Sequence, residues 1–136
     1  MRAEAAGMQA LGLAFDMILT SPLARAAETA AIVAAAFPEG AKPREMAALA
    51  TGVPPPEMLR ALRPYMRRHD TVLVVGHEPG LSRLASLLLT GSSGTLGMEL
   101  KKGGLISIEA HVTRRPAAAS LRWMLSPRQL RRLAHR

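Results

Sequence analysis

The 136-residue sequence contains no cysteine and only one Trp, one Tyr and two Phe. The absence of cysteine excludes disulfide bonds and thiolate metal sites. The scarcity of aromatic side chains argues against a surface that stacks nucleic-acid bases. No apolar run is long enough to span a bilayer. The first 14 residues make a poor signal peptide, because Glu4 lies early and glycines interrupt the apolar stretch. We therefore expect a cytoplasmic protein without a membrane partner.

Negative charge is also scarce, since 18 Lys and Arg stand against 10 Asp and Glu, for a net charge of +8. Such an excess favours an anionic partner: nucleic acid, a phosphorylated substrate or an acidic protein surface. Much of it lies in residues 60–69 and 114–136. An equally simple interpretation is the arginine-rich usage of a GC-rich genome. A basic nucleic-acid-binding module stays as an alternative function, and steep salt dependence of binding is its signature.

Hydrophobic periodicity predicts helices that alternate with strands. We expect helices over 1–14, 23–37, 57–68 and 80–89, and strands over 16–19, 71–75, 105–112 and 118–125, with a turn around 114–116 between the last two. The proline-rich loop 38–56 has room for one short strand near 45–47. This pattern predicts an α/β fold, a three-layer sandwich with a mostly parallel sheet. We expect one domain over 1–125, followed by a basic C-terminal tail, 126–136.

Two segments share one design: an apolar strand, a tight polar turn, a proline and a helix. They are residues 18–26 and 74–80. In an α/β sheet both turns lie at the carboxyl edge, where ligands bind. Each places a helix N-terminus there, which offers free N–H groups to an anion. In the first segment Ser21 suits an N-cap and Pro22 suits the first helical position.

The two turns supply four candidate phosphate-binding residues: Ser21, Arg25, Gly76 and His77. Arg25 lies one turn into its helix, and its guanidinium can grip two phosphate oxygens at once. Gly76 lets a ligand approach the backbone closely. His77 stands where an imidazole can donate to a phosphate oxygen. Taken singly, an arginine near a helix start is usually a solvated charge, and a histidine after a strand is often structural.

The remaining histidines and glycines carry no such signal. His69, His111 and His135 have no partner at metal-ligand spacing. No phosphate-binding P-loop is present, because the glycine-rich loop 91–97 lacks the required lysine. We therefore expect neither a metal nor a cofactor.

Residues 16–30 resemble the second conserved block of the histidine phosphatase superfamily, which has the phosphoglycerate mutase-like fold. Residues 72–84, with Gly76-His77-Glu78-Pro79-Gly80, resemble its later histidine block. Together with Glu99 to Gly104, they are similar to the short bacterial phosphohistidine phosphatases of the SixA group. The resemblance implies that Arg25 and His77 are catalytic residues that hold the phosphoryl group.

The resemblance also implies a nucleophilic histidine, in an Arg-His-Gly motif that ends the family's first strand. No such motif stands in this sequence, and Met1 falls inside what resembles the family's first helix. We expect that central strand, between the strands that end in the two blocks, to be missing. Residues 68–70, Arg-His-Asp, are no substitute, because they precede a strand and so lie at the opposite edge of the sheet, roughly 16 Å away.

The implied activity is removal of a phosphoryl group from protein phosphohistidine through a covalent phosphohistidine intermediate. The partner is then a phosphohistidine-containing protein, such as a phosphotransfer domain, because the short loop 38–56 holds no large cap over the site. The family's general-acid carboxylate is not evident, although Glu45 and Glu57 lie in the corresponding region. The alternative is a catalytically inactive protein that binds phosphate without hydrolysis. The sequence leaves the oligomeric state open.

Overall fold

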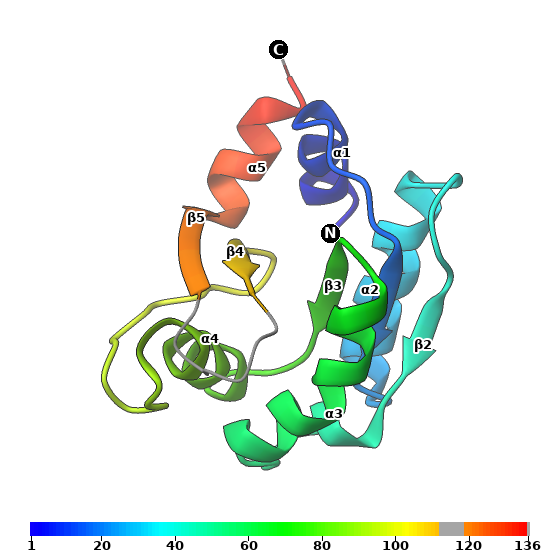
Figure 1. The fold of residues 1–136 in the computed structure, drawn as a ribbon. Coiled ribbons are helices and arrows are strands. Elements are labelled where there is room, and N and C mark those ends of the chain that lie inside the picture. The colour runs from blue at the N-terminus through cyan, green and yellow to red at the C-terminus, as the bar shows by residue number, and fades with distance from the viewer. Residues whose placement is uncertain (112–118, 136) are drawn as a thin grey trace.

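The computed structural model describes residues 1–111 and 119–135. It contains a parallel three-stranded sheet, an antiparallel two-stranded sheet and helices packed on them (Figure 1). The elements in chain order are α1 (Arg2–Ala10), β1 (Met17–Thr20), α2 (Ala24–Ala36), β2 (Pro43–Glu45), the 3-10 helix η1 (Ala47–Leu49), α3 (Pro55–Arg68), β3 (Val72–Val75), α4 (Gly80–Thr90), β4 (Leu105–Ala110), β5 (Ala119–Leu125) and α5 (Pro127–Leu133). This confirms the predicted α/β fold class. The turn expected around 114–116 lies outside the described residues.

Two clusters of buried apolar side chains define the layers. Ile18 and Leu73 belong to a cluster shared with α1, α2 and α5. Leu19 belongs to the other cluster, shared with η1, α3 and α4. Neighbouring residues of β1 serve different clusters because side chains alternate between the faces of a strand. The parallel sheet is therefore covered by helices on both faces, as the three-layer prediction requires.

The strand order of the parallel sheet corrects one expectation. The order is β2-β1-β3, and β1 pairs directly with β3, from Met17 opposite Val72 to Thr20 opposite Val75. The expectation that the missing strand belongs between these two is wrong, because their backbone hydrogen bonds join them as neighbours. Within the described residues, the other edge of β3 has no strand bonded to it. That edge faces β4 across an apolar cavity of about 210 Å³.

The basic segment expected as a tail forms α5 and packs beside α1 (Figure 1). Ser126 and Gln129 form a capping box, in which each side chain bonds the other's backbone N–H and so satisfies two free donors of the helix start. Leu130 is fully buried in the cluster on the α1 side of the sheet. Among all these helices of the described chain, none has the length and apolar character needed to cross a membrane.

Candidate functional site

The two candidate turns lie side by side at the carboxyl edge of the sheet. β1 and β3 run in parallel and end opposite one another, at Thr20 and Val75. The backbone N–H of Ser21 donates to the carbonyl of Val75 over 2.9 Å, which extends the pairing beyond the strands. The turn after β1 therefore begins next to Gly76 and His77, as the sequence predicted.

The expected N-cap at Ser21 is wrong. α2 begins at Ala24, and the helix start has no side-chain cap bond. The hydroxyl of Ser21 instead accepts a hydrogen bond from the backbone N–H of Leu23 over 3.1 Å, within the turn that precedes the helix. Pro22 accordingly lies before the helix.

The same hydroxyl of Ser21 lies 2.8 Å from Nε2 of His77. Ser21 is fully buried, whereas His77 is partly exposed. This contact joins the two turns across 56 positions of sequence. Two of the four candidate residues are therefore in direct contact. Binding of phosphate by the Ser21 hydroxyl itself stays a prediction.

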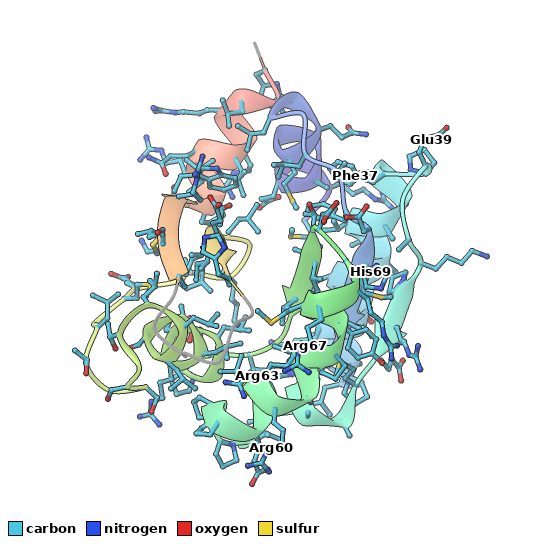
Figure 2. All side chains as sticks on the ribbon, viewed as in Figure 1. Phe37, Glu39, Arg60, Arg63, Arg67 and His69 are labelled. Atoms are coloured by element: carbon cyan, nitrogen blue, oxygen red, sulfur yellow. The ribbon has the colours of Figure 1, made fainter. Side chains whose placement is uncertain are left out.

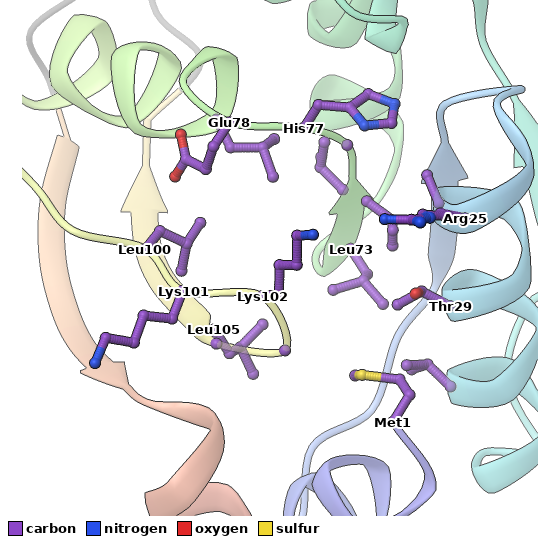
Figure 3. Close-up of a pocket in the computed structure, with 18 of the residues that line it drawn as sticks. Met1, Arg25, Thr29, Leu73, His77, Glu78, Leu100, Lys101, Lys102 and Leu105 are labelled. Atoms are coloured by element: carbon purple, nitrogen blue, oxygen red, sulfur yellow. The ribbon is translucent and has the colours of Figure 1, made fainter.

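Arg25 and His77 line one cavity of about 650 Å³ (Figure 3). Arg25 comes from the first turn of α2, and its side chain is exposed. Within the described residues it makes no ion pair with a carboxylate. Its guanidinium is therefore available to an anion in the cavity, and His77 lies close by on the same side (Figure 3).

Lys102 lines the cavity but was not among the site residues predicted from the sequence. It enters the cavity from the side opposite Arg25 and His77, whereas Lys101, which also lines the cavity, points its side chain away from Arg25 and His77 (Figure 3). The turn over 101–104 positions Lys102: the N–H of Gly104 donates to the carbonyl of Lys101 over 2.8 Å, and Gly103 has φ +83°. A glycine at that third position is what a type II turn requires. The Lys-Lys-Gly-Gly sequence at 101–104 could have indicated this turn and the lysine that it presents.

The carboxylates of the cavity also differ from those that the sequence suggested. Glu45 and Glu57 are not among the residues that line it, whereas Glu28 and Glu78 are. The carboxylate of Glu78 accepts hydrogen bonds from the backbone N–H and the hydroxyl of Ser82. Glu78 thereby caps the first turn of α4 from within its own loop, in keeping with the preference of helix starts for carboxylates.

Gly76 lines the cavity, and its lack of a side chain also serves packing. A Cβ at this position would lie 3.2 Å from the side chain of Leu81 and 3.6 Å from the carbonyl of Leu49. Close approach of a ligand to this backbone stays a prediction.

The other histidines lie away from the cavity. His69 follows the end of α3, at the start of the segment that leads into β3, so it lies at the opposite end of that strand from His77 (Figure 2). His77 is the one histidine among the described cavity residues. In residues 1–111 and 119–135 no cluster of three or more His, Asp or Glu side chains is arranged to hold a metal ion.

Two solved structures of similar fold are both described as SixA phosphatases. The structure of the protein histidine phosphatase SixA complexed with tungstate superposes with a TM-score of 0.77 at 18% sequence identity, over 95% of this chain and 80% of that one. The chain has a SixA-like histidine phosphatase fold. A putative phosphohistidine phosphatase SixA from Nakamurella multipartitia gives a TM-score of 0.66 at 26% identity, over 92% of this chain and 79% of that one.

Comparison of sequences identifies fewer relatives of known function than comparison of structures does. No family profile matches the chain. An uncharacterized protein from Picosynechococcus sp. is 37% identical over 112 residues, which are 79% of this chain and 64% of that protein. The chain thus spans less than two thirds of the length of the curated relative that it matches.

Proposed function

We propose that this chain is part of a phosphatase that removes a phosphoryl group from protein phosphohistidine. The observation that carries the proposal is the meeting of Arg25 and His77 on one side of a single cavity, at the carboxyl edge of parallel strands. Lys102 adds a third hydrogen-bond donor from the opposite side. Three donors that surround one space suit a phosphoryl group, whose oxygens are spread around phosphorus. The SixA-like fold agrees with a phosphatase-like function.

The proposed reaction has two steps. A nucleophilic histidine attacks phosphorus, the P–N bond to the substrate histidine breaks, and the leaving nitrogen takes a proton. Water then attacks the phosphoryl-enzyme, which releases inorganic phosphate and frees the nucleophile. Arg25 holds phosphoryl oxygens through both steps, and His77 donates to another oxygen. A phosphoramidate nitrogen is readily protonated, so the substrate makes little demand on a carboxylic acid of the enzyme.

The nucleophile in this proposal comes from a segment outside these 136 residues. The open edge of β3 faces β4 across the apolar cavity described above, lined on one side by Val72 and Val74 and on the other by Leu105 and Ile106. A strand that bonds to β3 here and runs parallel to it ends beside His77. Aliphatic side chains suit such a position, which is covered on both faces. We propose that this strand carries the attacking histidine at its end.

The partner is a protein, because the site has little covering it. Residues 38–56, where a cap would be inserted, form only β2 and the single turn η1. Arg25, Lys101 and Lys102 are exposed, and they present positive charge to an approaching acidic surface. A phosphohistidine on the surface of a phosphotransfer domain meets these requirements. The cytoplasmic location expected from the sequence suits such a partner.

The first test measures oxyanion binding by this chain, with tungstate and inorganic phosphate as probes in calorimetry. We expect Arg25→Ala and His77→Ala each to weaken binding at least about tenfold, as loss of a hydrogen bond to a charged group predicts. Arg60→Ala is the matched control, because Arg60 is exposed on α3 and does not line the cavity (Figure 2). Equal affinity in all four proteins would show that the cavity is not a phosphate site.

The second test concerns hydrolysis. The chain is extended at its N-terminus by an apolar strand that ends in Arg-His-Gly, and release of phosphate from a phosphohistidine protein is followed by ³¹P NMR. We expect turnover in the extended protein that is lost when the added histidine becomes Gln. Oxyanion binding without turnover favours the alternative, an inactive phosphate-binding protein.

A further inference from the structure

The contact between Ser21 and His77 determines which ring nitrogen of His77 carries the proton. The hydroxyl oxygen of Ser21 accepts the N–H of Leu23 over 3.1 Å and lies 2.8 Å from Nε2 of His77. A serine hydroxyl has one proton to donate and two lone pairs. The Leu23 N–H uses one lone pair, which leaves the proton and the second lone pair for other groups.

The hydroxyl proton of Ser21 has a single acceptor within reach among the described residues. Ser21 is fully buried, so water does not supply one. Among the described residues, Nε2 of His77 is the one hydrogen-bond partner of this hydroxyl other than Leu23. If Nε2 of the neutral ring carried the proton, the hydroxyl would lie buried with a proton and no acceptor, which is unfavourable. The hydrogen-bond network therefore assigns the acceptor role to Nε2.

Assignment of Nε2 as acceptor leaves the proton of the neutral ring on Nδ1. Figure 3 shows that the side of the His77 ring that carries Nδ1 faces the cavity. An Nδ1–H group there is a donor aimed at the space that Arg25 also borders. Free histidine favours the opposite tautomer in water, so the arrangement depends on the contact with Ser21.

We propose that Ser21 is a positioning residue, whose hydroxyl donates to Nε2 of His77, keeps the ring proton on Nδ1 and turns that N–H toward the phosphoryl group. Its role differs from direct phosphate binding, since both partners of the hydroxyl are protein atoms. The tautomer itself follows from the geometry of the free protein. Only the identity of the anion that Nδ1–H meets rests on the proposed function.

The experiment is a long-range ¹H–¹⁵N NMR spectrum of the histidine rings at about pH 9, where an ordinary imidazole is neutral. The His77 signals are assigned by their loss in His77→Gln. We expect the Nδ1–H tautomer to exceed Nε2–H by at least about fivefold, as the cost of an unsatisfied buried donor predicts. An excess of Nε2–H in the unmodified protein overturns the inference without any further variant.

Two serine variants separate positioning from folding. Ser21→Ala should move the His77 tautomer ratio toward Nε2–H by at least about fivefold. Ser86→Ala is the matched control: Ser86 is also fully buried and loses two hydrogen bonds, to Ser92 and Leu96, but it does not line the cavity. An unchanged ratio in Ser21→Ala, or an equal shift in Ser86→Ala, contradicts the proposal.

A tungstate titration of the same proteins tells this inference apart from the proposed function. We expect Ser21→Ala to bind tungstate roughly threefold to tenfold more weakly than Ser86→Ala, because its Nδ1–H donor is less populated. If no protein binds tungstate while the unmodified chain shows the Nδ1–H tautomer, the proposed function fails and the positioning role of Ser21 stands. If tungstate binds and the tautomer is Nε2–H, the positioning role of Ser21 fails and the proposed function stands.

Discussion

The carboxylate of Glu4, in the first helix, accepts a hydrogen bond from Nη1 of Arg131, in the last helix, over 3.0 Å. Its other oxygen lies 3.3 Å from the amino group of Met1. Burial raises the pKa of Glu4, but hydrogen bonds from the backbone and Arg131, together with the terminal ammonium, outweigh it and hold the pKa below the ordinary value of a glutamate. This pair joins the two ends of the chain beside the cavity, where Gly103 approaches the same carboxylate.

Glu4→Gln should lower the free energy of unfolding by about 1–2 kcal/mol at neutral pH, through loss of a charge-assisted hydrogen bond. Because the folded-state pKa is lower than the unfolded one, the contribution to stability is fully present above the ordinary glutamate pKa and disappears as the pH falls through the lower, folded-state pKa. The difference between Glu4→Gln and the unmodified protein should therefore shrink in acid. Urea unfolding between about pH 7 and about pH 3 measures it.

The control for that series is Glu39→Gln, since Glu39 is exposed on the loop after α2 (Figure 2). It should change stability by less than about 0.5 kcal/mol. A gap between Glu4→Gln and the unmodified protein that is constant across this pH range would show that Glu4 contributes through packing and not through its charge.

Gly7→Ala should destabilise the protein although alanine is the better helix former. On an exposed helix the change gains about 0.5–1 kcal/mol. Here a Cβ would lie 1.9 Å from the carbonyl oxygen of Leu130, so α1 and α5 must move apart. We expect a net loss of about 1–3 kcal/mol by thermal or urea unfolding. Gly94→Ala meets nothing within 4 Å and should be nearly neutral; a stabilised Gly7→Ala would contradict the close packing of the two helices.

Lys102→Met should weaken tungstate binding roughly threefold at low ionic strength, because an exposed ammonium contributes about 0.5–1 kcal/mol to an anion nearby. The difference should decrease with added salt. Lys101→Met is the matched control, since Lys101 is the neighbouring lysine and its side chain points away from Arg25 and His77 (Figure 3). Equal losses of tungstate affinity in both variants would show that Lys102 contributes only as one of several surface charges.

Gly103→Ala should cost about 1–2 kcal/mol of stability, because its φ of +83° disfavours any side chain. The added Cβ would also lie 3.3 Å from Pro127 and 3.4 Å from Glu4, so the turn that carries Lys102 must shift. Gly12→Ala imposes similar strain, at φ +72°, in open space. We expect both variants to lose stability, and only Gly103→Ala to lose tungstate affinity as well; calorimetry compares the two.

The sequence by itself determined the local elements and the two candidate turns. The apolar, mostly β-branched run Val72–Val75 predicts a strand, and the alanine-rich run Ala24–Ala36 predicts a helix. Both assignments depend on backbone preferences that act over a few residues. Parallel strands then bring their carboxyl ends to one edge, so the meeting of Arg25 and His77 in one cavity followed from the pattern.

The tertiary structure alone decided the strand order, the role of Ser21 and the place of the last helix. No local preference reveals that β1 and β3 are neighbours, that the Ser21 hydroxyl meets His77, or that α5 covers α1 instead of trailing as a tail. Each depends on which apolar faces are buried together, across separations of 56 residues for Ser21 and His77 and 127 for Glu4 and Arg131. Burial of the whole chain sets those contacts, whereas short-range propensity sets only the elements that make them.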